Sequence, residues 1–162
     1  MKLFRETTSP LGPITIFSDG VYITGIAFDY ERYPIDRTNA EPSDTPVLLD
    51  AERQLAEYFG GWRTSFDLPV KAPGTEFQQQ VWAALQEIPY GHTISYGELA
   101  QRLNNPKAVR AVGAANGHNP IAIVVPCHRV IGADGSLTGY GGGLERKKFL
   151  LELESKQPSL LQ

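Results

Sequence analysis

Residues 94–132 read ISYGELAQRLNNPKAVRAVGAANGHNPIAIVVPCHRVIG. Ser95 and Glu98 have the spacing of a capping box, which predicts the start of a short helix. The turn Asn104-Asn105-Pro106 follows, and Pro106 suits the first position of a second helix that we expect to reach Asn116. Two short helices joined by so tight a turn are typical of a helix-turn-helix.

The predicted second helix, KAVRAVGAAN at 107–116, carries almost no side-chain bulk. Two interpretations of this pattern stay open. Small residues let two helices pack closely, which needs no function. A slim helix can also enter a DNA groove, with Arg110 as its one long cationic side chain.

Downstream of this helix, residues 121–125 form a short apolar run that we interpret as a buried strand. Pro126-Cys127-His128-Arg129 interrupts this run, and Val130-Ile131 resumes it. A turn at 133–136 and a glycine-rich loop around Tyr140 follow, and glycine lets a backbone approach a ligand closely. A last helix is expected from Leu144 to Glu154, with Glu154 facing inward beside Leu150.

Upstream, β-rich runs flank Asp19-Gly20, a favoured tight-turn pair, and predict two strands. Residues 31–46 are polar and hold three prolines, so we expect a loop there. Thr45 and Pro46 then begin a helix with Leu48, Ala51, Leu55 and Phe59 at helical spacing, which ends at Gly60-Gly61. Thr75 to Gln78 form another capping box, whose helix continues to Ile88 and ends at Pro89-Tyr90-Gly91.

These elements predict an α+β protein of two domains. Residues 1–73 form a small antiparallel sheet with a helix. Residues 74–162 form a mostly helical domain of winged helix-turn-helix character that holds the whole site. The boundary is placed in the irregular, proline-containing stretch at 63–74.

The charge is unevenly distributed along the chain. The net charge is −3, yet residues 1–71 contribute −4 and residues 72–162 contribute +1. The stretch from Leu99 to Ala133 has no acidic residue and holds four basic ones, Arg102, Lys107, Arg110 and Arg129. Phosphate binding requires such a basic stripe, although a solvated basic face would look the same.

Targeting signals and cysteine content bear on location. We find no apolar run of membrane-spanning length and no signal-peptide pattern, so we expect a cytoplasmic protein that does not bind membranes. The single cysteine, Cys127, cannot form an internal disulfide, which agrees with a reducing compartment.

The sequence Pro126-Cys127-His128-Arg129 joins a thiol, an imidazole and a guanidinium. A nucleophilic cysteine must ionise, and a neighbouring base and positive charge favour the thiolate. His128 could take the proton directly or through a water, and Glu154 could hold His128 in the useful tautomer. Because adjacent residues of a strand point to opposite faces, direct Cys127–His128 contact would need a bend.

Four stretches together resemble the O6-alkylguanine-DNA alkyltransferase family, also called methylated-DNA–protein-cysteine methyltransferases. They are ISYGELA at 94–100, NPKAVRAVGAANGHNP at 105–120, IVVPCHRVIG at 123–132 and GSLTGYGGGLERKKFLLELE at 135–154. The resemblance runs almost unbroken from Gly74 to Glu154, weakens through 45–73 and is slight in the first forty residues.

The resemblance implies a role for each matching position in the reaction. Cys127 would accept the alkyl group, in a single-turnover repair of O6-alkylguanine. His128 and Glu154 would form the relay, Asn119 would organise the turn before the site, and Tyr96 would protonate the departing guanine. The predicted substrate pocket comprises Tyr140, Val130, Gly141 and Asn116.

The resemblance also implies how DNA is bound. Arg110 would fill the gap left by a flipped nucleotide, and we expect binding of double-stranded DNA through the minor groove. The other predicted DNA contacts are Ala111, Ala108, Gly113, Ala115, Lys107 and Ser95. The free protein is expected to be a monomer.

The resemblance does not extend to a metal site. Some relatives carry zinc in the N-terminal domain, but residues 1–91 contain no histidine and no cysteine. We therefore expect no metal and no cofactor. His118 and His92 are not expected to have catalytic roles, and position 141 is glycine where other members of the family carry a side chain.

Two other functions compete with this interpretation. A non-catalytic DNA-damage-binding module or regulator would explain Arg110 and the basic stripe, but it gives Cys127, His128 and Glu154 no role. A Cys-His hydrolase would explain the relay, but it gives the slim helix no role.

Overall fold

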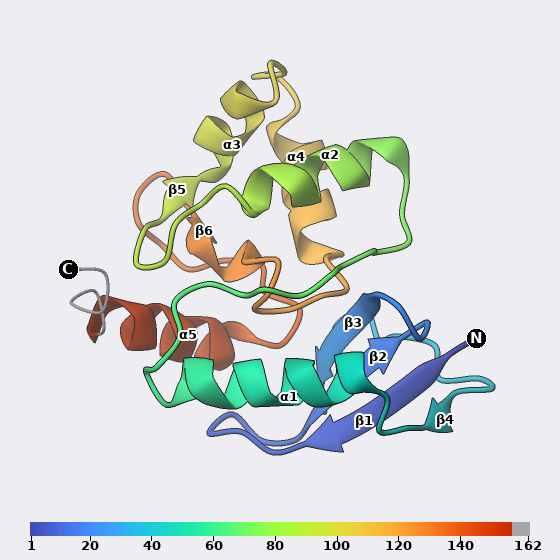
Figure 1. The fold of residues 1–162 in the computed structure, drawn as a ribbon. Helices are drawn as coiled ribbons and strands as arrows, with labels where there is room; N and C mark the ends of the chain where they lie inside the picture. The colour runs from blue at the N-terminus through green and yellow to red at the C-terminus, as the bar shows by residue number, and fades with distance from the viewer. Residues whose placement is uncertain (157–162) are drawn as a thin grey trace.

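A four-stranded sheet and one long helix build the N-terminal half of the molecule (Figure 1). The structure is a computed structural model and describes residues 1–156. The strands are β1 (Leu3–Thr7), β2 (Ile14–Ser18), β3 (Ile23–Phe28) and β4 (Glu41–Pro42), in the order β3-β2-β1-β4. The β2–β3 hairpin turns at Asp19-Gly20 as predicted. The short β4, in the predicted loop, pairs parallel to β1, so the sheet is only mainly antiparallel.

Helix α1 (Pro46–Phe59) packs against the sheet and ends at Gly60. It begins at Pro46 as predicted, although the Thr45 side chain makes no capping hydrogen bond. Its fully buried positions include Leu55 and Tyr58, whereas Phe59 is only partly buried. Phe59, the last residue of the predicted helical spacing, packs against the core from this partly buried position.

The C-terminal half is mostly helical. Its elements are α2 (Glu76–Leu85), β5 (Ile94–Ser95), α3 (Tyr96–Arg102), α4 (Val109–Gly117), a 3₁₀ turn at Cys127–Arg129, β6 (Val130–Ile131) and α5 (Leu144–Lys156). The capping box at Thr75 forms. Ser95 also caps its helix, but the Glu98 carboxylate binds Arg102 instead of returning to the cap.

The structure differs from the prediction in three places in this half. Helix α2 ends at Leu85 rather than Ile88, because residues 86–87 form a turn. Helix α4 begins at Val109 rather than Pro106, because residues 106–108 form a turn. Residues 121–125 are not a strand, because the chain turns tightly there: the Val125 N–H bonds to the Ile121 carbonyl at 3.0 Å, and Ile123 has φ +72°. The apolar pattern of residues 121–125 predicted correctly that they are buried, but it did not predict that they form a turn rather than a strand.

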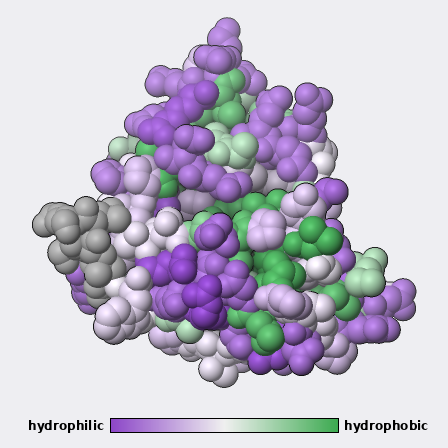
Figure 2. Space-filling model, in the orientation of Figure 1, coloured by the Kyte–Doolittle hydropathy of each residue, from purple (hydrophilic) through white to green (hydrophobic). Residues whose placement is uncertain are grey.

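The two halves share one continuous core. Ile26 of β3 donates its N–H to the Pro120 carbonyl at 2.9 Å and accepts the Ala122 N–H at 3.1 Å. The segment between α1 and α2 crosses the same seam, and its partly buried apolar side chains pack on the core (Figure 1): Phe66, Leu68, Val70 and Ala72. Figure 2 shows apolar surface gathered across the middle of this face.

The predicted domain boundary at 73–74 falls between α1 and α2, and it stays a prediction. Residues 157–162 of the predicted second domain lie outside the described residues. Within residues 1–156, no helix is long and apolar enough to cross a membrane.

Candidate active site and DNA-facing helix

Cys127 opens the 3₁₀ turn at Cys127–Arg129, and its side chain is 6% exposed. This turn supplies the bend that a strand would have lacked, so Cys127 and His128 need not face opposite sides. Burial raises the pKa of the Cys127 thiol to about 11, although the Asn119 amide beside it acts in the opposite direction. The resting cysteine is therefore a thiol at neutral pH and needs a base to ionise.

Glu154 of α5 is the centre of a buried hydrogen-bond network. Its Oε2 accepts from His128 Nε2 at 2.7 Å, Arg129 Nη2 at 3.0 Å and the Tyr58 hydroxyl at 2.6 Å. Its Oε1 accepts from Arg129 Nε at 2.8 Å and the Gly91 N–H at 3.3 Å. Although burial alone would raise it, the pKa of Glu154 lies well below its usual range, because His128 and Arg129 donate to the carboxylate.

His128 is fully buried, and this burial lowers its pKa below the usual value despite the partnership with Glu154. Since the carboxylate can only accept, Nε2 carries the hydrogen and Nδ1 is left as the basic nitrogen. Nδ1 has no hydrogen-bond partner among residues 1–156. His128 is thus a neutral imidazole with a free lone pair, which is what a proton acceptor requires.

Asn119 ties together the turn that leads to Cys127. Its Oδ1 accepts the Ile121 N–H at 3.0 Å, and its Nδ2 donates to the Val125 carbonyl at 2.7 Å. These bonds hold Ile123 at positive φ, a conformation unfavourable for a β-branched residue. The side chain of Asn119 therefore maintains a strained turn directly before Cys127.

The glycine-rich loop before α5 brings Tyr140 to the site. Tyr140 is buried against Phe28, and its pKa lies well above the usual range because of burial first and the nearby Cys127 second. The Gly141 carbonyl accepts the Arg32 N–H at 2.8 Å, and a Cβ at Gly141 would approach Glu31 Oε1 to 3.0 Å. A loop of the N-terminal half therefore lies against the predicted pocket.

Val130, Tyr96 and Asn116 border the same region. The Val130 carbonyl accepts from Lys147 Nζ at 2.6 Å, so one of its two lone pairs is already used. The Tyr96 hydroxyl donates to the Thr138 carbonyl at 3.0 Å, beside the glycine-rich loop. Asn116 is buried and donates to the Cys127 carbonyl at 3.4 Å, so it supports the turn from behind.

The predicted DNA contacts divide by exposure. Arg110 and Ala111 are exposed on α4, and Gly113 is half-buried beside the Tyr96 ring. Lys107 and Ala108 lie in the turn before α4, and Ser95 caps α3. Ala115 is 3% exposed and its carbonyl accepts from the Trp82 indole at 2.9 Å, so it lies on the core side of α4, and its contact with DNA stays a prediction.

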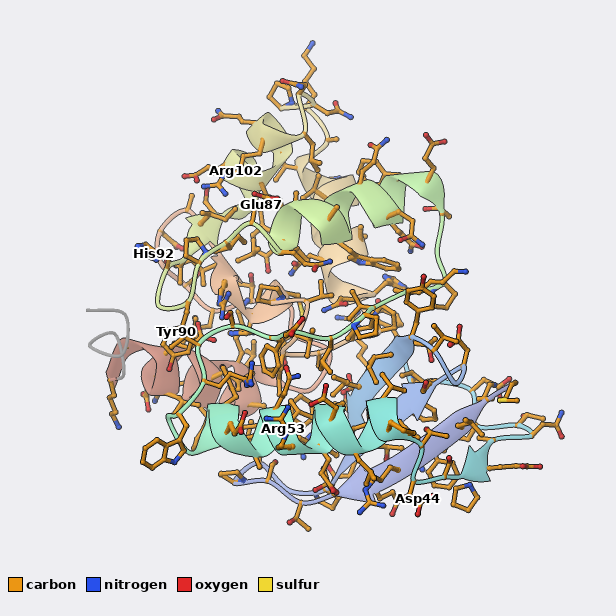
Figure 3. The ribbon with its side chains drawn as sticks, viewed as in Figure 1. Asp44, Arg53, Glu87, Tyr90, His92 and Arg102 are labelled. Carbon is orange, nitrogen blue, oxygen red and sulfur yellow. The ribbon has the colours of Figure 1, made fainter. Side chains whose placement is uncertain are left out.

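The basic stripe is smaller than the sequence indicated. Arg129 is buried in the Glu154 network, and Arg102 is paired with Glu98 at 2.7 Å. Arg102 lies on the outer side of α3 (Figure 3). Lys107 and Arg110 are left as the exposed cations of the stripe that form no ion pair within residues 1–156.

Three residues at the site were not predicted as members of it: Tyr58, Lys147 and Glu31. Lys147 could have been found, because it lies on the same helical face as Leu150 and Glu154; its Nζ bridges the Val130 and Thr138 carbonyls, and burial lowers its pKa to about 8. Tyr58 and Glu31 come from the other half of the chain, and no local pattern connects them with Cys127.

The remaining histidines lie in ordinary surroundings. His92 is exposed in the loop before β5 (Figure 3), and its Nδ1 contacts the Tyr90 carbonyl. His118 stacks on Tyr33 with ring centroids 3.8 Å apart. In the part of the chain that the structure describes, no cluster of three histidine, cysteine or acidic side chains could hold a metal ion.

Comparison with known proteins adds an independent finding. Residues 3–72 match the family model described as the ribonuclease-like domain of 6-O-methylguanine DNA methyltransferase, and residues 76–156 match the model of its DNA binding domain. A methylated-DNA–protein-cysteine methyltransferase of Mycobacterium tuberculosis is 52% identical over 95% of this chain and 93% of its own. One of Haemophilus influenzae is 51% identical over 90% of this chain and 82% of its own.

A solved structure agrees with these matches. The crystal structure of Mycobacterium tuberculosis OGT in complex with DNA superimposes with a TM-score of 0.90 at 49% identity, covering 99% of both chains.

Proposed function

The chain belongs to the 6-O-methylguanine DNA methyltransferase family, and from this premise we propose that Cys127 is the alkyl acceptor of a direct-reversal DNA repair reaction. The observation that carries this assignment is the buried hydrogen bond, 2.7 Å long, between Glu154 and His128, the residue directly after the only cysteine. A base held in one tautomer by a permanent carboxylate is what a buried thiol needs in order to ionise.

The proposed reaction begins with proton transfer. His128 accepts the Cys127 proton at Nδ1, through a bridging water. The thiolate then attacks the alkyl carbon, so that the S–C bond forms as the C–O6 bond breaks and the electron pair passes to the guanine.

Tyr96 gives the guanine ring a proton as it leaves, and a proton returns from His128 to Tyr96 through solvent. The products are guanine and a Cys127 thioether. No residue of the proposed site would remove the alkyl group from the Cys127 sulfur, so each molecule acts once.

For DNA, we propose that α4 enters the minor groove, with Arg110 filling the gap left by the flipped nucleotide. The target carbon is hidden in a duplex, so the base must leave the stack, which costs a few kcal/mol. Support comes from the exposure of Arg110 and Ala111 on a helix of little bulk, and from the DNA complex of the Mycobacterium tuberculosis relative. The proposed contacts are Arg110, Ala111, Gly113, Lys107, Ala108 and Ser95.

The proposed base pocket comprises Tyr140, Val130, Gly141 and Asn116, reached from the side of Cys127. We propose that the active unit is a monomer. We propose that it acts in the cytoplasm, on nucleoid DNA. We also propose that residues 1–73 and residues 74–162 form its two domains.

The test is intact-protein mass after mixing with a short duplex that carries one O6-methylguanine. The expected result is a gain of one methyl group per chain that stops at one equivalent and is absent in Cys127→Ser. Retained DNA binding without any gain would favour a non-catalytic damage-binding module. Turnover of an ester beyond one equivalent would favour a hydrolase.

A further inference from the structure

Tyr58 is the one side chain of α1 that reaches the relay. It lies 96 positions before Glu154 in the sequence, yet its hydroxyl donates to Glu154 Oε2 at 2.6 Å. The exposed fractions of the two residues are 0% and 1%. The hydrogen bond therefore connects the N-terminal half to the carboxylate that holds His128.

The oxygen that Tyr58 contacts is the one that His128 also contacts. Arg129 already fixes the plane of the carboxylate, because its Nε and Nη2 donate to different oxygens. The Tyr58 hydroxyl is thus not needed to orient the group in that plane. It withdraws electron density from Oε2, and so weakens the attraction of Glu154 for a proton on His128.

Other charged and titratable groups face this pair from every element packed around it. They are Tyr58 from α1, Tyr90 from the segment after α2, Arg129 from the 3₁₀ turn, Tyr140 from the glycine-rich loop and Lys147 from α5, and Cys127 precedes His128 in the 3₁₀ turn. Arg129 and Lys147 oppose a positive charge on His128, as does burial. Glu154 alone favours that charge, so a group that moderates Glu154 acts on the balance directly.

We propose that Tyr58 is a positioning residue of the relay: its hydroxyl moderates Glu154, so that His128 stays a neutral imidazole able to accept the Cys127 proton. The N-terminal half thereby sets the pH range over which the site works. This inference rests on the proposed function of Cys127, His128 and Glu154.

Tyr90 offers a matched control. It lies above α5 in Figure 3, and its ring is 6.1 Å from that of Tyr58 in an edge-to-face contact. Its buried hydroxyl makes no hydrogen bond with any residue in 1–156. Tyr90→Phe therefore removes the same atom from the same cluster without touching the carboxylate.

The experiment compares the whole chain as wild type, Tyr58→Phe and Tyr90→Phe. Two reactions of Cys127 are followed against pH: methyl transfer from duplex DNA and alkylation by iodoacetamide. Both rates fall on the acid side as His128 becomes protonated. In Tyr58→Phe we expect this midpoint to move up by about one pH unit, because a hydrogen bond to a charged group contributes an amount comparable to one pKa unit.

A direct readout is the NMR titration of the histidine rings, with His92 and His118 as internal references. The pKa of His128 should rise in Tyr58→Phe and stay unchanged in Tyr90→Phe. If Tyr58→Phe does not fold, 3-fluorotyrosine at position 58 keeps the hydroxyl and makes it a stronger donor, which should move the midpoint to lower pH.

The same acid midpoint in wild type and Tyr58→Phe would overturn the inference. This holds even if the two proteins differ in rate by a constant factor, because a merely structural role would change the rate equally at every pH. Failure of the proposed function gives a different result. In that case wild type takes no methyl group from DNA, while the iodoacetamide profiles still separate Tyr58→Phe from Tyr90→Phe.

Discussion

Arg110 and Arg129 come from the same acid-free stretch, but the protein uses them in different environments. Arg110 is exposed on α4, whereas Arg129 is 7% exposed and donates to both oxygens of Glu154 and, at 2.6 Å, to the Ile88 carbonyl. A buried guanidinium must be paired and hydrogen-bonded, so it is fixed by the fold. An exposed one contributes little to the fold and is available to a partner. Exposure therefore separates the residues that build this site from those that we propose contact DNA.

The largest expected effect tests the buried side of this comparison. Arg129→Met should lower the free energy of unfolding by about 3–5 kcal/mol, because breaking a buried ion pair leaves Glu154 charged and undercompensated. Urea denaturation measures it. Arg110→Ala should change stability by less than about 0.5 kcal/mol, as expected for an exposed residue. Similar losses of unfolding free energy in Arg129→Met and Arg110→Ala would contradict the distinction between a buried, structural arginine and an exposed one.

The exposed side is tested next by repair rates. Arg110→Ala should slow methyl transfer from duplex DNA by about 10- to 100-fold, because the extruded base loses a side chain that offsets part of a cost of a few kcal/mol. Reaction with free O6-methylguanine should change little. Arg102→Ala is the control, since Arg102 is exposed but paired with Glu98. Equal losses of Arg110→Ala on duplex and free base would remove its role in flipping.

The Glu154 network should also give stability a characteristic acid dependence. The folded pKa of Glu154 lies below its ordinary value of 4.5, so its contribution is fully present above about pH 4.5 and is lost as pH falls below it. Below that pH, wild type should lose about 1.4 kcal/mol per pH unit more than Glu154→Gln. Urea titrations at several acidic pH values check this, and parallel curves for both proteins would contradict it.

The smallest expected effect concerns a residue that is neither fully buried nor exposed. Glu31 is half-buried near the site, and its charge raises the pKa of Cys127. Glu31→Gln should therefore speed alkylation of Cys127 by iodoacetamide at neutral pH by about two- to threefold, because a nearby like charge disfavours the thiolate. Glu145→Gln, on the exposed start of α5, serves as the control. An unchanged rate in Glu31→Gln would show that this charge is screened at Cys127.

Much of the secondary structure followed from local signals. The hairpin at Asp19-Gly20, the capping box at Thr75 and the inward-facing Glu154 depend on residues close together in the sequence, and all three are present. The turn at 121–125 was missed, because burial makes a turn as apolar as a strand. Only the Asn119 side chain, which replaces strand pairing with its own hydrogen bonds, distinguishes the two.

The site was predictable where its parts are contiguous. Cys127 and His128 are neighbours, and the helical spacing of α5 placed Glu154 inward. Tyr58 and Glu31 were not predictable, because long-range packing brings them to the site. The burial of Ala115 was not predictable either, because a small residue can face either a groove or a core, and here its carbonyl accepts from the Trp82 indole.

The hydrogen bonds around Glu154 also impose an order on the making of the protein. A ribosome adds Tyr58, Gly91, His128 and Arg129 before it adds Glu154, and the network needs all of them. Until Glu154 emerges and α5 docks, His128 has no carboxylate to set its tautomer, and Cys127 is an ordinary thiol. If Cys127, His128 and Glu154 act as proposed, the growing chain therefore carries Cys127 without its complete relay, which forms only after Glu154 has been added and α5 has docked.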